Sequence, residues 1–162
     1  MELRRAVVDG VRVQMISGTH VLLLRDAEEA RYLPIPIGPS EASAIAYHLQ
    51  GVTPERPLTH DTALQAIRAL GARLREVRIT EVREETVRAR LVLVDLRGDQ
   101  AEPAARPSDA VALALRAEAP IFISADLLST EGIVPEAAEE ERLSLFRDFV
   151  NSLDGEEPPA AR

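Results

Sequence analysis

The chain has 162 residues, of which 46% are hydrophobic, and its net charge is −8. This is the size of one domain with an appendage, and the apolar fraction is enough for a packed core. The absence of cysteine excludes disulfides and thiolate-bound metals, and no apolar run approaches the roughly 20 residues of a membrane-spanning helix. The first residues lack the apolar segment of a signal peptide, so we expect a cytoplasmic protein with no membrane partner.

The negative charge is concentrated near the C-terminal end. Residues 1–125 have a net charge of −1, whereas residues 126–162 have a net charge of −7. An acidic protein is in general a poor match for nucleic acid, whose phosphates need basic partners. The near-neutral body can nevertheless carry a local basic patch, and all 19 basic residues are arginines. Overall charge therefore does not exclude a nucleic-acid partner.

Three strands are expected first along the chain, at residues 3–16, 21–24 and 31–37. A turn or bulge is expected at Asp9-Gly10, and the second and third strands form a hairpin. Pro34 and Pro36 have no N–H group to donate to a neighbouring strand. We therefore expect the third strand to lie at a sheet edge or to point these missing donors outward.

Helices and strands then alternate. Helix-start signals followed by apolar stripes predict three helices, at residues 39–50, 59–70 and 106–118. Further strands are expected at residues 73–83, 86–96 and 120–124. At the end of the chain, residues 126–135 are expected to be irregular. Residues 136–153 are expected to form an amphipathic helix, and residues 154–162 a disordered end. The predicted fold is α+β, a mixed, largely antiparallel sheet packed with three helices, plus a C-terminal amphipathic helix. The predicted domain covers residues 1–130, followed by an acidic helical tail over 131–162.

Two of the helix starts have nearly the same sequence. The two segments are Pro39-Ser40-Glu41-Ala42 and Pro107-Ser108-Asp109-Ala110, and the segment Arg56-Pro57 before the remaining helix matches Arg106-Pro107. A Pro-Ser-acid sequence is a good helix opening by itself, so the similarity can be purely structural. Alternatively, the helix N-termini converge and their free N–H groups form an anion site. The sequence leaves both interpretations open.

The candidate site residues come from these helix starts, because the chain contains no established phosphate-binding or hydrolase motif. The candidates for proton transfer or metal binding are His60, Asp61, Asp109 and Glu41. The candidates for holding a phosphate group are Arg56, Arg106 and Ser108. Helix capping and dipole complementarity can also explain the acidic residues. The metal is unknown, and a divalent Mg²⁺ or Mn²⁺ ion remains a candidate cofactor.

Four segments in this order resemble the bifunctional nuclease domain family. These segments are residues 33–42, 56–61, 106–116 and 119–123, and the resemblance covers roughly residues 3–130. It implies a compact α+β domain, often self-associated as a homodimer, with activity against both DNA and RNA. The chain departs from the family at Pro36, where members often have a large aromatic residue. Some members of the family carry a further C-terminal module, and this chain has only its acidic tail at that place.

Two functional hypotheses follow. In the first, the protein is a nuclease that hydrolyses phosphodiester bonds of DNA and RNA with little sequence preference. Its contact with nucleic acid is expected to be weak and made through phosphates, because only 3% of residues are aromatic and none is Trp. In the alternative, it is a non-catalytic regulatory or assembly module that binds a small anionic ligand or a protein partner. The acidic tail is expected to dock on the body, on a second subunit or on a partner.

Overall fold

The computed structural model describes residues 1–135, so the amphipathic helix and the disordered end expected over 136–162 lie outside the described residues. The described strands form one sheet in the order β3-β2-β1-β8-β4-β5-β6, and β7 also pairs with β5. The eight strands are β1 (Leu3–Val13), β2 (His20–Asp26), β3 (Tyr32–Ile37), β4 (Ala72–Arg83), β5 (Thr86–Asp95), β6 (Gln100–Ala101), β7 (Ala104–Ala105) and β8 (Ile121–Ser124).

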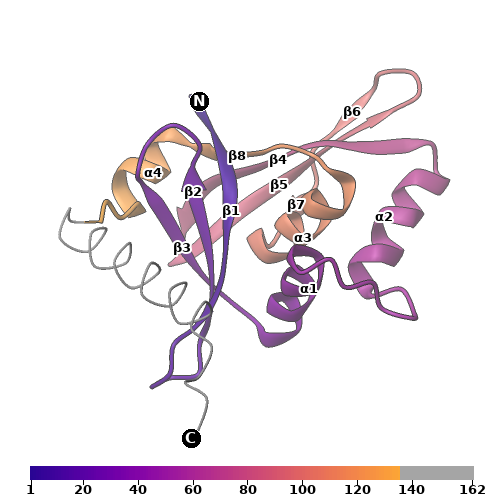
Figure 1. Cartoon of the computed structure of the whole chain (residues 1–162). Coiled ribbons are helices and arrows are strands. Elements are labelled where there is room, and N and C mark those ends of the chain that lie inside the picture. Colours follow the sequence, from indigo (N-terminus) through magenta and orange to yellow (C-terminus); the bar gives the residue numbers. More distant parts are fainter. Residues whose placement is uncertain (136–162) are drawn as a thin grey trace, which may run out of the picture.

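The helices within residues 1–135 are α1 (Pro39–Leu49), α2 (Thr59–Ala69), α3 (Pro107–Ala117) and α4 (Ala125–Glu131). Figure 1 shows α1, α2 and α3 grouped on one side of the sheet and α4 at its other end, near β2 and β3. Among the described strand pairs only β4 and β8 run parallel. The predicted α+β fold with a mixed, largely antiparallel sheet is therefore confirmed.

The core lies between the sheet and the first three helices, and α3 is at its centre. This helix contacts both α1 and α2, as well as β4 and β5. Its buried residues include Ala110, Ala112 and Ala114, none of which is exposed at all. Small side chains let neighbouring backbones approach closely, because dense packing then needs little space between the elements. The alanine-rich sequence of α3 is thus what allows two other helices to pack on it.

The edge strand β3 is blocked against further strand pairing. Tyr32 exchanges two main-chain hydrogen bonds with Ile133, from N–H to carbonyl at 2.8 and 2.7 Å. The outward groups of an antiparallel strand alternate, so residues 34 and 36 also direct their main-chain nitrogens outward. Both are prolines, and this position confirms the expected edge. A bulge between Val8 and Gly10 in β1 confirms the expected irregularity there.

The prediction of an irregular segment at residues 126–135 was wrong in its first half, because α4 occupies Ala125–Glu131. The hydroxyl of Ser124 accepts a hydrogen bond from the N–H of Leu127 at 3.5 Å, which caps the start of this helix. Leu127 and Leu128 are buried. These two buried leucines and the serine cap hold α4 against strands β3, β4 and β8. The domain boundary at residue 130 remains a prediction.

Candidate functional site

The starts of α1, α2 and α3 meet, and their side chains form a connected polar cluster. The Nε2 atom of His60 lies 2.8 Å from Oδ1 of Asp109. The guanidinium of Arg106 donates from Nε to Oδ2 of Asp109 at 2.7 Å and from Nη2 to Oε1 of Glu41 at 2.9 Å. We call these four residues the helix-start cluster. The structure therefore brings together four of the seven candidate site residues.

The repeated helix-start sequence explains how the two acids reach Arg106. In both α1 and α3 a proline occupies the first helical position and an acid lies in the first turn. Neither helix has a side-chain cap. Gly38 precedes α1, and a Cβ atom at this position would collide with the carboxylate of Glu41. Glycine leaves room for the present Glu41 conformation, and any other residue there would make this flexible side chain shift.

Asp109 holds His60 in a defined orientation. Burial raises the pKa of the Asp109 carboxyl, but hydrogen bonds from Arg106 and His60 outweigh it and hold this pKa below its usual range. An ionised carboxylate only accepts hydrogen bonds, so Nε2 of His60 carries the hydrogen. No residue within 1–135 hydrogen-bonds to Nδ1. The second ring nitrogen is thus left as a proton acceptor, on a side chain that is 11% exposed.

Asp61 lies outside the helix-start cluster. Its Oδ2 accepts a hydrogen bond from the N–H of Leu58 at 2.8 Å, and its Oδ1 accepts from Nε of Arg116 at 2.7 Å. Burial raises the pKa of Asp61, but the hydrogen bonds from Leu58 and Arg116 outweigh it and lower this pKa. Arg116 also donates to the carbonyls of Ala112 and Ala44 at 3.0 and 3.1 Å. These contacts link the start of α2 and the middle of α1 to the end of α3.

The remaining two candidates, Arg56 and Ser108, make no side-chain hydrogen bond within residues 1–135. Arg56 is exposed in the loop before α2. Ser108 is only 5% exposed and is the second residue of α3. Its hydroxyl oxygen is not among the fully buried unpartnered atoms, so it still reaches solvent on an otherwise buried side chain.

A groove of about 610 Å³ leads to Arg106. It is lined by residues 35–38 at the end of β3, residues 85–88 at the start of β5, and residues 104–108 across β7 and the start of α3. Strands β3 and β5 lie near opposite edges of the strand order. The sheet therefore curls until its two edges face each other across the groove, with the start of α3 between them.

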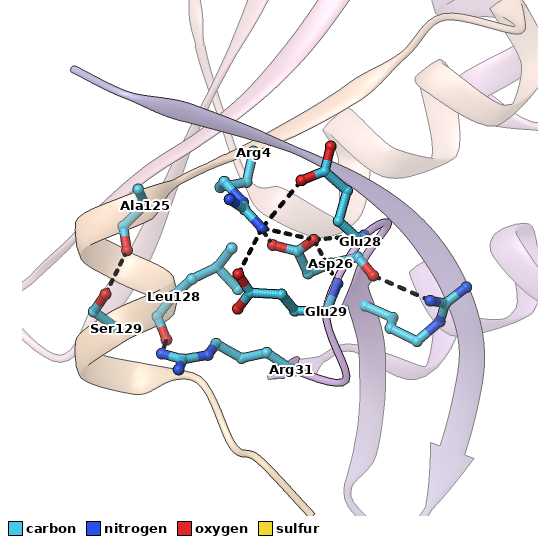
Figure 2. Close-up of polar contacts among 9 residues, drawn as sticks. Arg4, Asp26, Glu28, Glu29, Arg31, Ala125, Leu128 and Ser129 are labelled. Carbon is cyan, nitrogen blue, oxygen red and sulfur yellow. Dashed lines mark hydrogen bonds and ion pairs between the residues drawn. The ribbon is translucent and has the colours of Figure 1, made fainter.

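A second polar cluster lies at the other end of the sheet, and Figure 2 shows its contacts. The carboxylate of Asp26, 2% exposed, accepts hydrogen bonds from Nε of Arg4 at 3.0 Å and from the N–H groups of Glu28 and Glu29 at 2.7 and 3.2 Å. Arg4 also pairs with the carboxylates of Glu28 and Glu29. We call these four residues the turn cluster, because they hold the turn between β2 and β3. Burial raises the pKa of Asp26, but these hydrogen bonds outweigh it and lower this pKa.

The sheet face opposite the helices carries a row of arginines. Arg5, Phe122, Arg78 and Arg90 are paired neighbours on β1, β8, β4 and β5. The residues that alternate with them belong to the core, so this row faces away from α1–α3. The guanidinium of Arg5 lies 5.8 Å from the ring centre of Phe122. Arg78 is neutralised by Glu76 and Glu102.

Residues 1–135 contain neither a metal-binding cluster nor a membrane-spanning helix. No group of three or more His, Asp or Glu side chains there is arranged to hold a metal ion. None of the helices described is long and apolar enough to cross a membrane.

Comparison with known protein families gives a match to the bifunctional nuclease domain over residues 22–136. The chain belongs to this family. Its similarity to an uncharacterized protein, MT1877, of Mycobacterium tuberculosis strain CDC 1551 is 43% identity over 155 residues, covering 90% of this chain and 92% of the relative. The uncharacterized protein Rv1829 of strain H37Rv matches to the same extent. The resemblance seen in the sequence is thus confirmed, and the helix-start cluster lies inside the bifunctional nuclease domain.

Sequence reasoning missed two residues that border this site. Arg116 lies seven residues after Asp109, which places both on one face of α3, and this spacing was a usable signal. Arg88 lines the groove but was not among the candidate site residues. Its place there depends on the curl of the sheet, for which the local sequence carries no signal.

Proposed function

We propose that this protein is a nuclease that hydrolyses phosphodiester bonds of DNA and RNA with little sequence preference. Membership of the bifunctional nuclease domain family supports a nuclease-like activity. The observation that carries the proposal is the contact of His60 with Asp109, joined through Arg106 to Glu41. Hydrolysis of a phosphodiester needs a base for water and positive charge for the transition state, and this cluster contains both.

His60 is the proposed general base. Asp109 accepts the hydrogen of Nε2, which leaves Nδ1 to take a proton from the attacking water. Asp109 also stabilises the imidazolium that forms, as a carboxylate does in other histidine-based hydrolases. Glu41 keeps the guanidinium of Arg106 in place and is the second carboxylate available for proton transfer.

Arg106 and Ser108 are the proposed contacts to the phosphate. Arg106 is 67% exposed and spends only two of its five N–H groups on Asp109 and Glu41, so others remain for a phosphate oxygen. Arg56, exposed in the loop before α2, adds a third contact. Arginine contacts to phosphates carry no base information, which fits little sequence preference. For Asp61 we propose a positioning role through Arg116.

The test is cleavage of labelled single- and double-stranded DNA and RNA, with Mg²⁺, Mn²⁺ or a chelator, by the wild-type protein and by Asp109→Asn. We expect the variant to lose about 100-fold or more in rate, because His60 loses its ionised partner. The matched control is Asp126→Asn, which removes an exposed first-turn acid from α4. Equal rates for wild type and Asp109→Asn, in every metal condition, would contradict the proposed site.

The alternative is a non-catalytic regulatory or assembly module that binds a small anion. The observation that favours it is that both carboxylates of the helix-start cluster are ion-paired with Arg106, as in a structural brace. A thermal-shift screen distinguishes the two. Stabilisation by small anions, without cleavage of any nucleic acid, would support the module.

Assembly is a separate part of the proposal. The family resemblance implies a homodimer, and Met15 and Ile16 in the turn after β1 are almost completely exposed apolar side chains that a second subunit could cover. We propose that the acidic tail docks on the body, on the second subunit or on a protein partner.

A further inference from the structure

We propose that the groove between the two edges of the sheet binds an extended single strand of DNA or RNA, with one backbone phosphate held at the start of α3 between Arg88 and Ser108. This inference rests on the proposed nuclease function, because it places the substrate strand against the helix-start cluster. It adds the form of the substrate, which is single-stranded, and a binding residue, Arg88.

The start of α3 lacks an acceptor that a phosphate would supply. Ser108 lines the groove, is 5% exposed, and has no hydrogen-bond partner for its hydroxyl within residues 1–135. The first main-chain hydrogen bond of this helix is made by Ala110, to the carbonyl of Arg106 at 3.0 Å. The N–H groups of Ser108 and Asp109 therefore have no main-chain partner in the described part of the chain, and no side chain caps them. A phosphate oxygen at this point would accept from both the hydroxyl and an N–H group.

The charges along the groove complement a phosphate backbone. Arg88 is exposed and forms no ion pair with any residue in 1–135. Arg106 also lines the groove, with N–H groups still free. Among the residues that line the groove, Glu85 is the one acid. Arg106 at the uncapped start of α3, together with Arg88 on β5, makes this groove favourable for an anion.

The walls of the groove suit a single strand better than a duplex. One wall consists of Ile35, Pro36 and Ile37, and the other includes Val87, Ala104 and Ala105. A duplex presents its charged backbone outward and keeps its bases stacked inside, so it offers little to an apolar wall. An unpaired strand exposes base faces and sugars, which can pack on proline and aliphatic side chains while the phosphate reaches the arginines.

The edge strand also disfavours a protein strand as the occupant. An extended peptide binds a sheet edge through main-chain hydrogen bonds. At β3 the outward positions 34 and 36 are prolines, which have no hydrogen to donate. A nucleic acid does not need these donors, so the same wall remains available to its apolar surfaces.

The position of the groove links this subsite to the chemistry. Gly38 lines the groove and lies directly against the carboxylate of Glu41. Arg106 lines it as well and contacts Asp109, the partner of His60. A strand with one phosphate at Ser108 would therefore present a neighbouring phosphodiester to the helix-start cluster.

The test measures binding separately from cleavage. A short fluorescein-labelled single strand with phosphorothioate linkages, which resist hydrolysis, and its duplex are titrated with the full-length protein by fluorescence anisotropy. We expect the single strand to bind more tightly than the duplex. Arg88→Gln should weaken single-strand binding about fivefold and reduce the slope of log K against log salt by about 0.7, the loss of one phosphate contact. Ser108→Ala should weaken it about threefold without lowering the melting temperature, because the hydroxyl bonds to nothing in the fold.

The control is Arg97→Gln, an exposed arginine in the turn beyond the opposite end of β5, and about 23 Å of strand separate Arg88 from that end at Asp95. It should leave binding unchanged. The proposal would be overturned if Arg88→Gln and Arg97→Gln lost the same affinity for the single strand. It would also be overturned if the protein bound the duplex as tightly as the single strand, or bound neither. Alternation on β5 gives Arg88 and Arg90 the same strand face, so a loss in Arg5→Gln or Arg90→Gln as large as that in Arg88→Gln would overturn it in favour of the open sheet face. If Arg88→Gln weakens binding but the wild-type protein cleaves no nucleic acid, the nuclease proposal is refuted and the binding groove stands. If the protein cleaves and Arg88→Gln does not change the cleavage rate, the binding groove is refuted and the nuclease proposal stands.

Discussion

The turn cluster and the helix-start cluster are built from the same groups and differ in what they leave unsatisfied. In the turn cluster Asp26 is buried, and Arg4 faces three carboxylates of the chain itself. In the helix-start cluster Asp109 is 29% exposed and Arg106 is 67% exposed, at the end of a groove. The first arrangement is complete without a ligand. The second retains free donors and an uncapped helix start.

This difference shows which feature separates a structural ion pair from a candidate site. Both aspartates have a pKa below the usual range, and in both the cause includes an arginine. Perturbed ionisation therefore does not distinguish them. What distinguishes them is the histidine on Asp109 and the neighbouring Ser108, a nearly buried residue whose hydroxyl reaches solvent and has no partner within residues 1–135.

The largest effect on stability is expected at the turn cluster. Asp26→Asn keeps the size of the side chain but removes the negative charge to which Arg4 and two main-chain N–H groups donate hydrogen bonds. We expect the free energy of unfolding to fall by about 2–3 kcal/mol, measured by urea denaturation. Cleavage per folded molecule should not change, since this cluster lies apart from the groove.

The matched control for this change is Glu28→Gln. The Glu28 side chain is 78% exposed and its contact with Arg4 is 3.4 Å, so we expect a change below about 0.5 kcal/mol. If Asp26→Asn were as stable as wild type, or if it lost cleavage at unchanged stability, the assignment of the turn cluster to structure would be wrong.

The pH dependence of the free energy of unfolding also compares the turn cluster with the helix-start cluster, and the expected changes are smaller. Both Asp26 and Asp109 have a folded-state pKa below the usual 3.8. The stability that each contributes is therefore fully present above that pH and is lost as the pH falls through the lowered pKa. In urea denaturation at a series of pH values, the difference between wild type and Asp26→Asn should shrink below about pH 3.8. For Asp109→Asn the change should be smaller, because solvent screens the more exposed carboxylate. A difference that grows on acidification would contradict this account.

Much of the fold could be predicted because its signals are local. Apolar alternation defined the long strands, and Pro34 and Pro36 indicated the edge that β3 occupies. The helix starts at Pro39 and Pro107 were visible as proline followed by an acid. The helix α4 was missed because Ser124 also ends a strand, so its role as a cap was hidden by the strand pattern.

The site could be predicted only as a set of residue types. His60 and Asp109 are 49 positions apart, and their contact depends on how α2 packs on α3. The sequence could not separate Asp61 from its neighbour His60, although the two side chains reach opposite ends of α3. The groove depends on the curl of the whole sheet, which no single segment encodes.

The most direct test of the central claim, that the helix-start cluster performs the chemistry, is the cleavage rate of His60→Gln. It should be measured on the preferred substrate beside wild type and His48→Gln, purified in parallel and normalised to the folded fraction. His48 is exposed on α1 and makes no contact with the cluster. We predict a loss of about 100-fold or more for His60→Gln and no change for His48→Gln. Equal rates for the two variants would contradict the claim and would leave the helix-start cluster as a structural brace.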